Sequence, residues 1–192
     1  KEAFDMANLT ELRWHGRGGQ GAKTASTLLG KVAAKTGKRI QAFPEYGPER
    51  MGAPILAYNR ISDGNITIHC QVSEPDIVVV LDPTLLEVVD VTEGLSDDGI
   101  IIVNTTDDPE TLKEKLNFAG EVRTVDAYTI SREEIGRPIP NTPMIGALIK
   151  TTELLPFEEL LDYIEEELEK KFSHKPEIVK RNLEAIKRAY EE

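Results

Sequence analysis

Hydrophobic and polar positions divide the chain into strand-like segments that alternate with helical ones. In residues 11–15 polar and apolar side chains alternate, which predicts a strand over about 8–15. The segments 77–81 and 100–103 are unbroken apolar runs, as expected of strands covered on both faces of a parallel sheet. Apolar residues recur at helical spacing in 20–36, which predicts a helix. Gly37 follows directly and is a natural helix stop. This alternation predicts an α/β fold with a mostly parallel sheet and helices on both faces.

Two aspartate–proline pairs continue the pattern. Asp82-Pro83 and Asp108-Pro109 each join an N-cap residue to a proline suited to the first helical position. A further strand is expected at 121–125. Asp82 follows a central strand, at the edge where ligands bind in such sheets, but capping alone accounts for it. We therefore interpret Asp82 as a helix cap.

Further caps are expected beyond the last strand. Ser131-x-x-Glu134 has the spacing of a capping box, here for one short turn. Asn141 or Thr142 is expected to cap a helix that starts at Pro143.

The C-terminal part is predicted to be helical. Apolar stripes at helical spacing cover 157–172 and 179–190, which suggests a helical hairpin. We expect a single α/β domain over residues 1–192. Its core would span about 8–150, with C-terminal helices over about 151–192.

An inserted β-hairpin is predicted within this core. The segments 55–61 and 66–72 flank a turn cluster at 62–65, and polar and apolar residues alternate in the second arm. That alternation places Cys70 on the inward side. We expect a buried, inert thiol there.

Four glycines occur within six residues between the first strand and the first helix. Strand, glycine loop and helix is the arrangement that points backbone N–H groups and a helix N-terminus at an anion. Arg17 lies inside the loop, and with Arg13 and Lys23 it makes the local charge positive. We therefore expect an anion-binding loop, whose candidate binding residues are Gly16, Arg17, Gly18, Gly19, Gln20 and Gly21.

Three interpretations of this glycine loop are open. The G-x-G-x-x-G spacing that starts at Gly16 fits a dinucleotide fingerprint, but Pro44 ends the second strand and the nearest acid, Glu45, lies beyond it. A P-loop needs Lys directly after its last glycine, and here Ala22 intervenes. In the third interpretation, the glycines serve only a tight crossing from strand to helix.

The segment 43–54 contains three prolines and two glycines, which predicts an irregular loop. It also carries aromatic, acidic and basic side chains. One hypothesis is that it crosses the mouth of the glycine loop and offers Arg50 to an anionic ligand. The alternative is that Glu45 or Glu49 pairs with Arg50 and only holds the segment.

Composition narrows the classes of function. A net charge of −11 makes nucleic acid and anionic membranes poor partners. No apolar run approaches the length of a membrane span, and the first residues lack the apolar region of a signal peptide. Cys70 is the one cysteine, and the three histidines lie far apart, so no metal site of its own is expected. We expect a cytoplasmic protein.

The motifs together resemble the gamma subunit of pyruvate:ferredoxin oxidoreductase and related 2-oxoacid:ferredoxin oxidoreductases. The resemblance runs from about residue 8 to 150 and is expected to extend to the end, which implies a Rossmann-like core. It rests on five motifs in chain order: the loop 16–21, the segment 43–54, Arg60-Ile61-Ser62-Asp63, Asp82-Pro83 and Asn141-Thr142-Pro143-Met144-Ile145-Gly146.

The resemblance implies a subunit of a larger enzyme. That enzyme decarboxylates a 2-oxoacid on thiamine diphosphate, passes electrons through iron–sulfur clusters to ferredoxin and releases an acyl-CoA. Thiamine diphosphate, magnesium and clusters would reside in alpha, beta and delta-type partner subunits, and this chain would hold no catalytic residue. The family's gamma domain is associated with coenzyme A, whose phosphates suit the N–H groups of 18–21, Arg17 and Arg50.

Two other classes compete with the family interpretation. One is a stand-alone dinucleotide-binding oxidoreductase. The other is a purely structural assembly subunit whose glycine loop packs against a partner. Which 2-oxoacid is used would be decided by a pocket in another subunit.

Overall fold

A computed structural model describes residues 9–45 and 52–192. Six strands form one sheet in the order β2-β3-β1-β4-β5-β6. Neighbours β1, β4, β5 and β6 pair in parallel, and only β3 runs antiparallel to its neighbours β1 and β2. The predicted mostly parallel sheet is confirmed. Its strands are β1 (Thr10–Arg17), β2 (Arg39–Pro44), β3 (Pro54–Ser62), β4 (Ile77–Val80), β5 (Ile100–Asn104) and β6 (Glu121–Val125).

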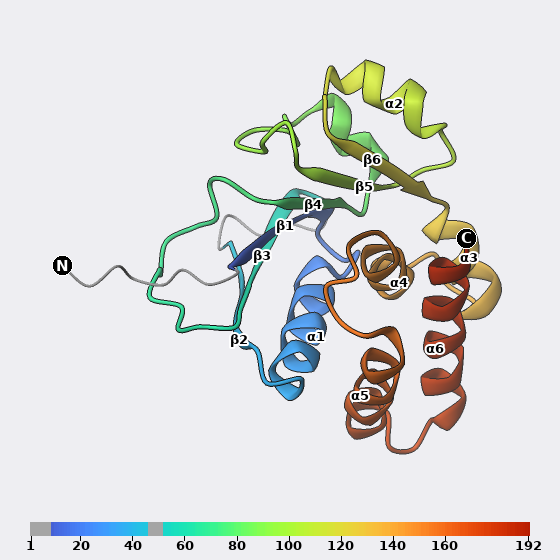
Figure 1. Ribbon diagram of the computed structural model, residues 1–192. Coiled ribbons are helices and arrows are strands. Elements are labelled where there is room, and N and C mark those ends of the chain that lie inside the picture. The colour runs from blue at the N-terminus through green and yellow to red at the C-terminus, as the bar shows by residue number, and fades with distance from the viewer. Residues whose placement is uncertain (1–8, 46–51) are drawn as a thin grey trace.

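Helices cover both faces of the sheet, as predicted. In Figure 1, α2 lies on one side of the strands and α1, α4, α5 and α6 lie on the other. Two apolar clusters correspond to these faces, and the larger joins α1 to the C-terminal helices. The helices are α1 (Ala22–Lys35), the 3-10 helix η1 (Pro83–Glu87), α2 (Pro109–Leu116), α3 (Ala127–Glu134), α4 (Asn141–Thr152), α5 (Phe157–Lys171) and α6 (Pro176–Glu191). None of them, within the described ranges, has the length and apolar character needed to cross a membrane.

The aspartate–proline caps form as predicted. The Asp82 side chain accepts a hydrogen bond from the N–H of Thr84 at the start of η1. Asp108 likewise accepts from the N–H groups of Glu110 and Thr111 at the start of α2. In both cases a short polar side chain satisfies N–H groups that have no acceptor inside the helix.

Two other predicted caps are wrong. Asp126 caps α3, which begins at Ala127, so Ser131 lies inside the helix and is buried. The capping-box spacing misleads because an acceptor five residues earlier starts the helix first. The residue at the N-cap of α4 is Pro140, with no side-chain cap, so neither Asn141 nor Thr142 caps that helix.

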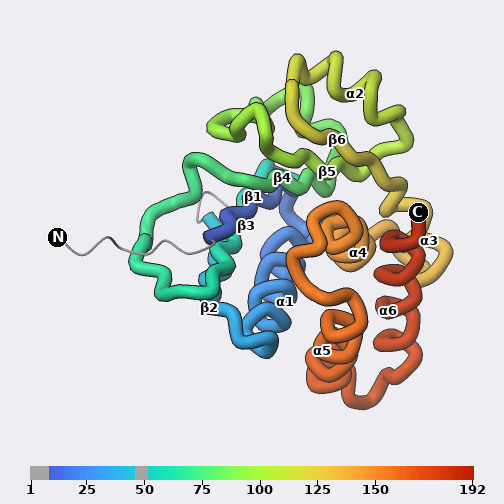
Figure 2. The backbone as a smooth tube through the Cα atoms, in the orientation of Figure 1, coloured from blue at the N-terminus to red at the C-terminus, as the bar shows by residue number. Residues whose placement is uncertain are grey.

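The predicted β-hairpin does not form. Its first arm is β3, but 66–72 is irregular, and β3 pairs with β2 and β1 instead. Both edges of β3 are thus occupied, and side chains bind carbonyl groups of 66–72 in place of a strand. The guanidinium of Arg60 donates to the carbonyl oxygens of Cys70 and Gln71 at 2.8 and 3.2 Å, and Gln41 donates to that of Ile68 at 2.8 Å. Figure 2 shows the connection from β3 to β4 looping out beside the sheet.

The expectation for Cys70 is therefore also wrong. The thiol is exposed. Without a strand at 66–72, alternation along the sequence no longer determines which side chains point inward.

Helix α4 packs very closely on α6. A Cβ at Gly146 would collide with the backbone carbonyl oxygen of Ile186. Glycine at this position lets the two helix backbones approach each other, and most of the α4 side chains are buried between the sheet and α6. The glycine in the motif 141–146 thus serves helix packing.

Candidate functional site

The candidate site lies at the carboxyl edge of the sheet. Arg17 ends β1, Asp82 follows β4, and Asn104 ends β5. From β1 the chain goes to β2 on one side of the sheet, whereas β4 flanks β1 on the other side. Ligands of open α/β sheets bind at such a switch point.

Two glycines of the loop have a backbone conformation that other residues rarely adopt. Gly19 has a φ of 100° and Gly21 a φ of 88°. A Cβ at Gly21 would lie 2.6 Å from Nδ2 of Asn141, whereas a Cβ at Gly19 would meet no atom within 4 Å. Gly21 is therefore required by both backbone and packing, and Gly19 by backbone alone.

The N-terminus of α1 is uncapped. No side chain among the described residues caps it, and Gly21 is the N-cap. The first bond of the helix runs from the N–H of Ala25 to the carbonyl oxygen of Gly21, so the preceding N–H groups have no acceptor within the helix. Together with the helix dipole, these groups favour an anion. The exposed Lys23 adds a positive charge in the first turn.

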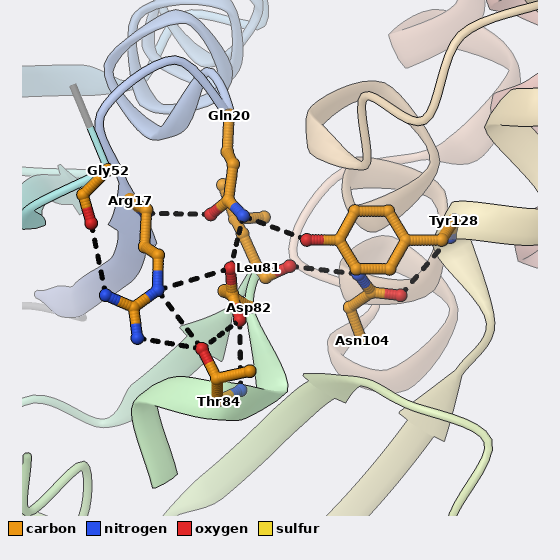
Figure 3. Close-up of polar contacts among 8 residues, drawn as sticks. All are labelled: Arg17, Gln20, Gly52, Leu81, Asp82, Thr84, Asn104 and Tyr128. Atoms are coloured by element: carbon orange, nitrogen blue, oxygen red, sulfur yellow. Dashed lines mark hydrogen bonds and ion pairs between the residues drawn. The ribbon is translucent and has the colours of Figure 1, made fainter. Parts of the chain in front are cut away.

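Gln20 joins the ends of three elements. Its Oε1 accepts a hydrogen bond from the backbone N–H of Arg17 at 2.7 Å. Its Nε2 donates to the carboxylate of Asp82 and, at 2.9 Å, to the hydroxyl of Tyr128 (Figure 3). The glycine loop is thereby tied to the segment after β4 and to α3.

The guanidinium of Arg17 is bonded within the protein. Its Nε and Nη2 donate to Oγ1 of Thr84 at 3.1 and 2.8 Å, and its Nη1 donates to the carbonyl oxygen of Gly52 at 3.1 Å. Nε also lies 3.5 Å from Oδ2 of Asp82. A guanidinium has five N–H donors, so one N–H on each Nη atom remains for a ligand. The side chain is 27% exposed, which leaves it within reach.

Asp82 is the charged centre of this network. Burial raises the pKa of its carboxyl, but donation from the hydroxyl of Thr84, from Gln20 and from the backbone N–H of Thr84, together with the charge of Arg17, outweighs burial and lowers the pKa. The carboxylate therefore stays ionised. Its role as a cap is confirmed, and its contacts with Arg17 and Gln20 go beyond capping.

Two residues of the site were missed by the sequence analysis. Asn104 donates to the carbonyl oxygen of Leu81 at 2.9 Å and accepts from the N–H of Tyr128 at 3.3 Å. Burial and the nearby charge of Asp82 raise the pKa of Tyr128 to about 12, so its hydroxyl stays protonated. A polar residue that ends a buried apolar strand was the available signal for Asn104. Tyr128 had none, because it is brought in by α3.

The remaining predicted site residues have different positions. Gly16 lies at the end of β1, where a Cβ would come within 3.2 Å of Cβ of Ala22. Gly18 is paired through its backbone with the far end of the segment 43–54, donating to the carbonyl oxygen of Ala53 at 2.9 Å and accepting from the N–H of Gly52 at 3.2 Å. Arg50 lies outside the described residues, so its predicted contact with a ligand stays a prediction.

The geometry disfavours a dinucleotide across the switch point. The side chain of Gln20 spans the gap between the ends of β1 and β4 and would have to move. Glu45, the nearest acid after β2, accepts a hydrogen bond from Tyr58 at 2.6 Å instead of facing the loop. Within residues 9–45 and 52–192, no cluster of three or more His, Cys, Asp or Glu side chains could hold a metal ion.

Comparison with known proteins gives consistent matches over nearly the whole chain. A family model described as pyruvate ferredoxin/flavodoxin oxidoreductase matches residues 11–192. The pyruvate synthase subunit PorC of Thermotoga maritima is 50% identical over 182 residues, which are 95% of this chain and 93% of that protein. The pyruvate/ketoisovalerate oxidoreductases common subunit gamma of Pyrococcus furiosus is 48% identical over 184 residues, 95% of this chain and 96% of that protein.

Solved structures agree. The crystal structure of the Thermotoga maritima pyruvate oxidoreductase subunit PORC matches with a TM-score of 0.83 and 48% identity, over 96% of each chain. A 2-oxoglutarate:ferredoxin oxidoreductase from Magnetococcus marinus, solved with 2-oxoglutarate, coenzyme A and succinyl-CoA bound, matches with a TM-score of 0.74 and 18% identity. That match covers 94% of this chain and 30% of the longer one. At this identity it shows the shared fold alone.

Proposed function

This chain belongs to the pyruvate ferredoxin/flavodoxin oxidoreductase family, and from that membership we propose that it is the gamma subunit of a pyruvate:ferredoxin oxidoreductase. The enzyme would convert pyruvate and coenzyme A to acetyl-CoA and carbon dioxide, with two electrons passed to ferredoxin. The observation that carries the proposal is identity of about half over nearly the full length of a pyruvate synthase subunit. Membership of this family argues against the alternative of a stand-alone dinucleotide-binding oxidoreductase.

We place the redox cofactors in partner subunits. The chain has one cysteine, whereas an iron–sulfur cluster takes several cysteine ligands. Thiamine diphosphate, magnesium and the clusters would thus belong to alpha, beta and delta-type subunits. Thiamine diphosphate supplies the carbanion chemistry of decarboxylation when bound there. The assembled enzyme would work in the cytoplasm, where coenzyme A and ferredoxin are available.

We further propose that the glycine loop binds a phosphate of coenzyme A. The uncapped N-terminus of α1 offers backbone N–H groups, and no atom of the described residues crowds the position of a Cβ at Gly19. The two remaining N–H donors of Arg17 suit a phosphate oxygen. These groups fit the diphosphate or the 3′-phosphate of coenzyme A.

The carboxylate of Asp82 would oppose an anion at this place. Its charge is compensated by the ion pair with Arg17 and by hydrogen bonds from Gln20 and Thr84. A phosphate that contacts the free N–H groups of Arg17 and the start of α1 would therefore meet a locally balanced site. This balance distinguishes a phosphate site from a surface dominated by the chain's net charge of −11.

The chain's part in the reaction would be binding and orientation. Contacts to the nucleotide end of coenzyme A hold the reactive thiol in place at a distance, so that binding energy far from the reacting atoms lowers the entropic part of the barrier. Gln20 and Asn104 would keep the loop in its geometry. No residue of this chain needs to accept or donate a proton in the carbon chemistry.

Isolation of the assembled enzyme tests the subunit proposal. A tagged copy of the chain is recovered from its native cells, and the preparation is analysed for partner proteins, iron and thiamine diphosphate. We expect larger partners, both cofactors, and reduction of ferredoxin that depends on pyruvate and coenzyme A. Recovery of the chain alone, with saturable binding of NAD(H), would contradict the proposal.

One observation favours a purely structural role as second candidate. The hydrogen bonds of Arg17 and Gln20 tie the glycine loop to Gly52, to Thr84 and to Tyr128, which would hold the loop in its conformation without a ligand. A structural loop predicts that coenzyme A binds to the complex equally well when Arg17 is replaced.

A further inference from the structure

A groove of about 640 Å³ lies on the face of the sheet opposite α1. On β1, Leu12 and Trp14 belong to the apolar cluster that contains α1, so the alternate residues Arg13 and His15 face the other way. There η1 and α2 pack over β4 and β5, whereas no described helix covers the neighbouring part of β1 and β3. The residues that line the groove are His15, Glu45, Ala53, Pro54, Ile55, Leu56, Leu85, Val89, Asp90 and Glu93.

The walls of the groove are largely apolar. Ala53 directly precedes β3, Leu56 lies near the start of that strand, and Leu85 and Val89 come from η1 and the turn after it. A concave apolar surface of this size is typical of a binding site.

His15 offers one polar group to this groove. Nε of Arg13 donates to Nε2 of His15 at 3.0 Å, and since arginine only donates, the imidazole carries its proton on Nδ1. Nδ1 has no partner among the described residues, and no fully buried side-chain nitrogen or oxygen there lacks one. The ring is only 5% exposed, so its remaining accessible donor borders the groove that it lines.

His15 is a neutral donor. Burial, and after it the charge of Arg13, lower the pKa of His15 to about 3. The floor of the groove therefore presents an uncharged N–H group near neutral pH.

Three carboxylates, those of Glu45, Asp90 and Glu93, border the groove, and no lysine or arginine is among the described residues that line it. Arg13, a described cation that contacts the lining residue His15, is 6% exposed and also donates to the carbonyl oxygens of Val91 and Glu93. The rim formed by the described residues is therefore acidic, and a polyanion such as coenzyme A would be repelled by it. A cationic partner is favoured by charge complementarity.

We propose that this groove receives a segment of a partner subunit in which an apolar side chain is flanked by lysine or arginine. The apolar side chain would pack between the apolar walls of the groove, and the basic residue would face Glu45, Asp90 and Glu93. A backbone carbonyl of the segment would accept a hydrogen bond from Nδ1–H of His15. The inference rests on the proposed role as a subunit of a larger complex. It adds the surface and the chemistry of the contact.

Charge reversal on the rim tests the contact. Glu93 is exposed, and its carboxylate accepts no hydrogen bond from a described residue and acts on Arg13 only through its charge, so Glu93→Lys should leave the fold intact. The chain is purified separately and combined with the remaining subunits of the complex. We expect Glu93→Lys to weaken association about tenfold or more, because a cation then faces the basic partner. The matched control is Asp162→Lys on α5, an exposed acid that does not line this groove. We expect this control to leave association unchanged within about twofold.

Cross-linking identifies the occupant. Cys70 is the one cysteine, so Cys70→Ser with Glu93→Cys creates a single attachment point for a benzophenone group. In the assembled complex we expect one cross-linked peptide of a partner subunit, with an apolar residue next to lysine or arginine. The same group at Asp162→Cys in the same background is the control.

The outcomes separate this inference from the proposed function. If the wild-type chain fails to join the other subunits, the subunit proposal fails and the groove contact falls with it. If the wild-type chain assembles but Glu93→Lys assembles equally well, the groove inference alone is overturned. A cross-link to a second copy of this chain, to a segment without a basic residue, or to no partner would overturn it too.

Discussion

The side chain of Gln20, in the middle of the glycine loop, donates a hydrogen bond to the carboxylate of Asp82 at the end of the neighbouring strand. The same amide nitrogen donates to Tyr128, and the amide oxygen holds the backbone of Arg17. Together these contacts make the loop part of a network that joins three elements. The conformation of the loop is therefore set by the protein before any ligand arrives.

Replacing Gln20 by glutamate tests this network. Gln20→Glu places a second carboxylate against Asp82 and removes the donor, so we expect a loss of about 1 to 3 kcal/mol in the free energy of unfolding at pH 7. The loss should shrink as the pH falls and the new carboxyl becomes protonated, since it can then donate. Urea unfolding at pH 7 and pH 5 measures this. Gln71→Glu adds the same charge at an exposed position and should change stability little; equal effects of the two changes would contradict the role of Gln20.

A comparison of Gly19→Ala with Gly37→Ala separates the role of the glycine loop in binding from the general cost of alanine at positive φ. Gly19 and Gly37 both have positive φ, 100° and 86°, and both have open space where a Cβ would go. Alanine at either position should cost on the order of 1 kcal/mol of stability. Only Gly19→Ala should also weaken coenzyme A binding by the assembled enzyme, because only Gly19 is in the loop. Isothermal titration with coenzyme A checks this, and equal binding by both variants would argue for a purely structural loop.

Arg17→Ala should raise the KM for coenzyme A roughly 10- to 150-fold in the assembled enzyme and leave the KM for pyruvate unchanged. The reason is the loss of a charge-assisted contact to phosphate, which contributes about 1.5 to 3 kcal/mol. Thr84→Val is the control, because it removes an acceptor of Arg17 while keeping the guanidinium charge. If Arg17→Ala slowed use of pyruvate and coenzyme A alike, a structural role for Arg17 would explain the result better.

Arg60→Ala should destabilise the fold strongly. Arg60 is 1% exposed and its Nε lies 2.6 Å from the carboxylate of Glu11, so its removal leaves that carboxylate without its partner. We expect a loss of about 3 to 5 kcal/mol, with faster amide hydrogen exchange in 66–72. Lys38→Ala, which breaks the exposed pair with Asp63, should cost at most about 1 kcal/mol. A similar small loss for Arg60→Ala would show that its buried contacts add little.

His15 should make stability fall at moderately acidic pH. Its pKa is about 3 in the folded chain, against about 6.5 for an unfolded histidine, so the unfolded state binds more protons between these values. The free energy of unfolding then decreases as the pH falls from 6.5, by up to about 1.4 kcal/mol per pH unit from this residue. His15→Gln keeps an acceptor for Arg13 and should remove this part of the slope. Urea unfolding of both proteins from pH 7 to 5 gives the difference, and an imidazole of His15 that titrates near pH 6.5 by NMR would refute it.

The sequence alone determined the order and type of most elements. Unbroken apolar runs predicted β4 and β5, because a strand that is buried on both faces carries apolar side chains on both of them. Asp82 and Asp108 with their following prolines marked the starts of η1 and α2, because capping is a contact between near neighbours in the chain. The glycine loop was located in the same way, since strand, glycines and helix are adjacent in sequence.

Tertiary structure decided the rest, because the deciding contacts join residues far apart in the chain. The expected partner strand β3 pairs with β1 and β2, so Arg60 and Gln41 bind carbonyl groups of 66–72 in place of the predicted hairpin, and Cys70 is exposed. Tyr128 reaches the glycine loop only because α3 packs beside the ends of the strands. Alternation and spacing describe one segment at a time. The hydrogen-bond partner of a given group, in contrast, depends on all the segments that the fold brings close to it.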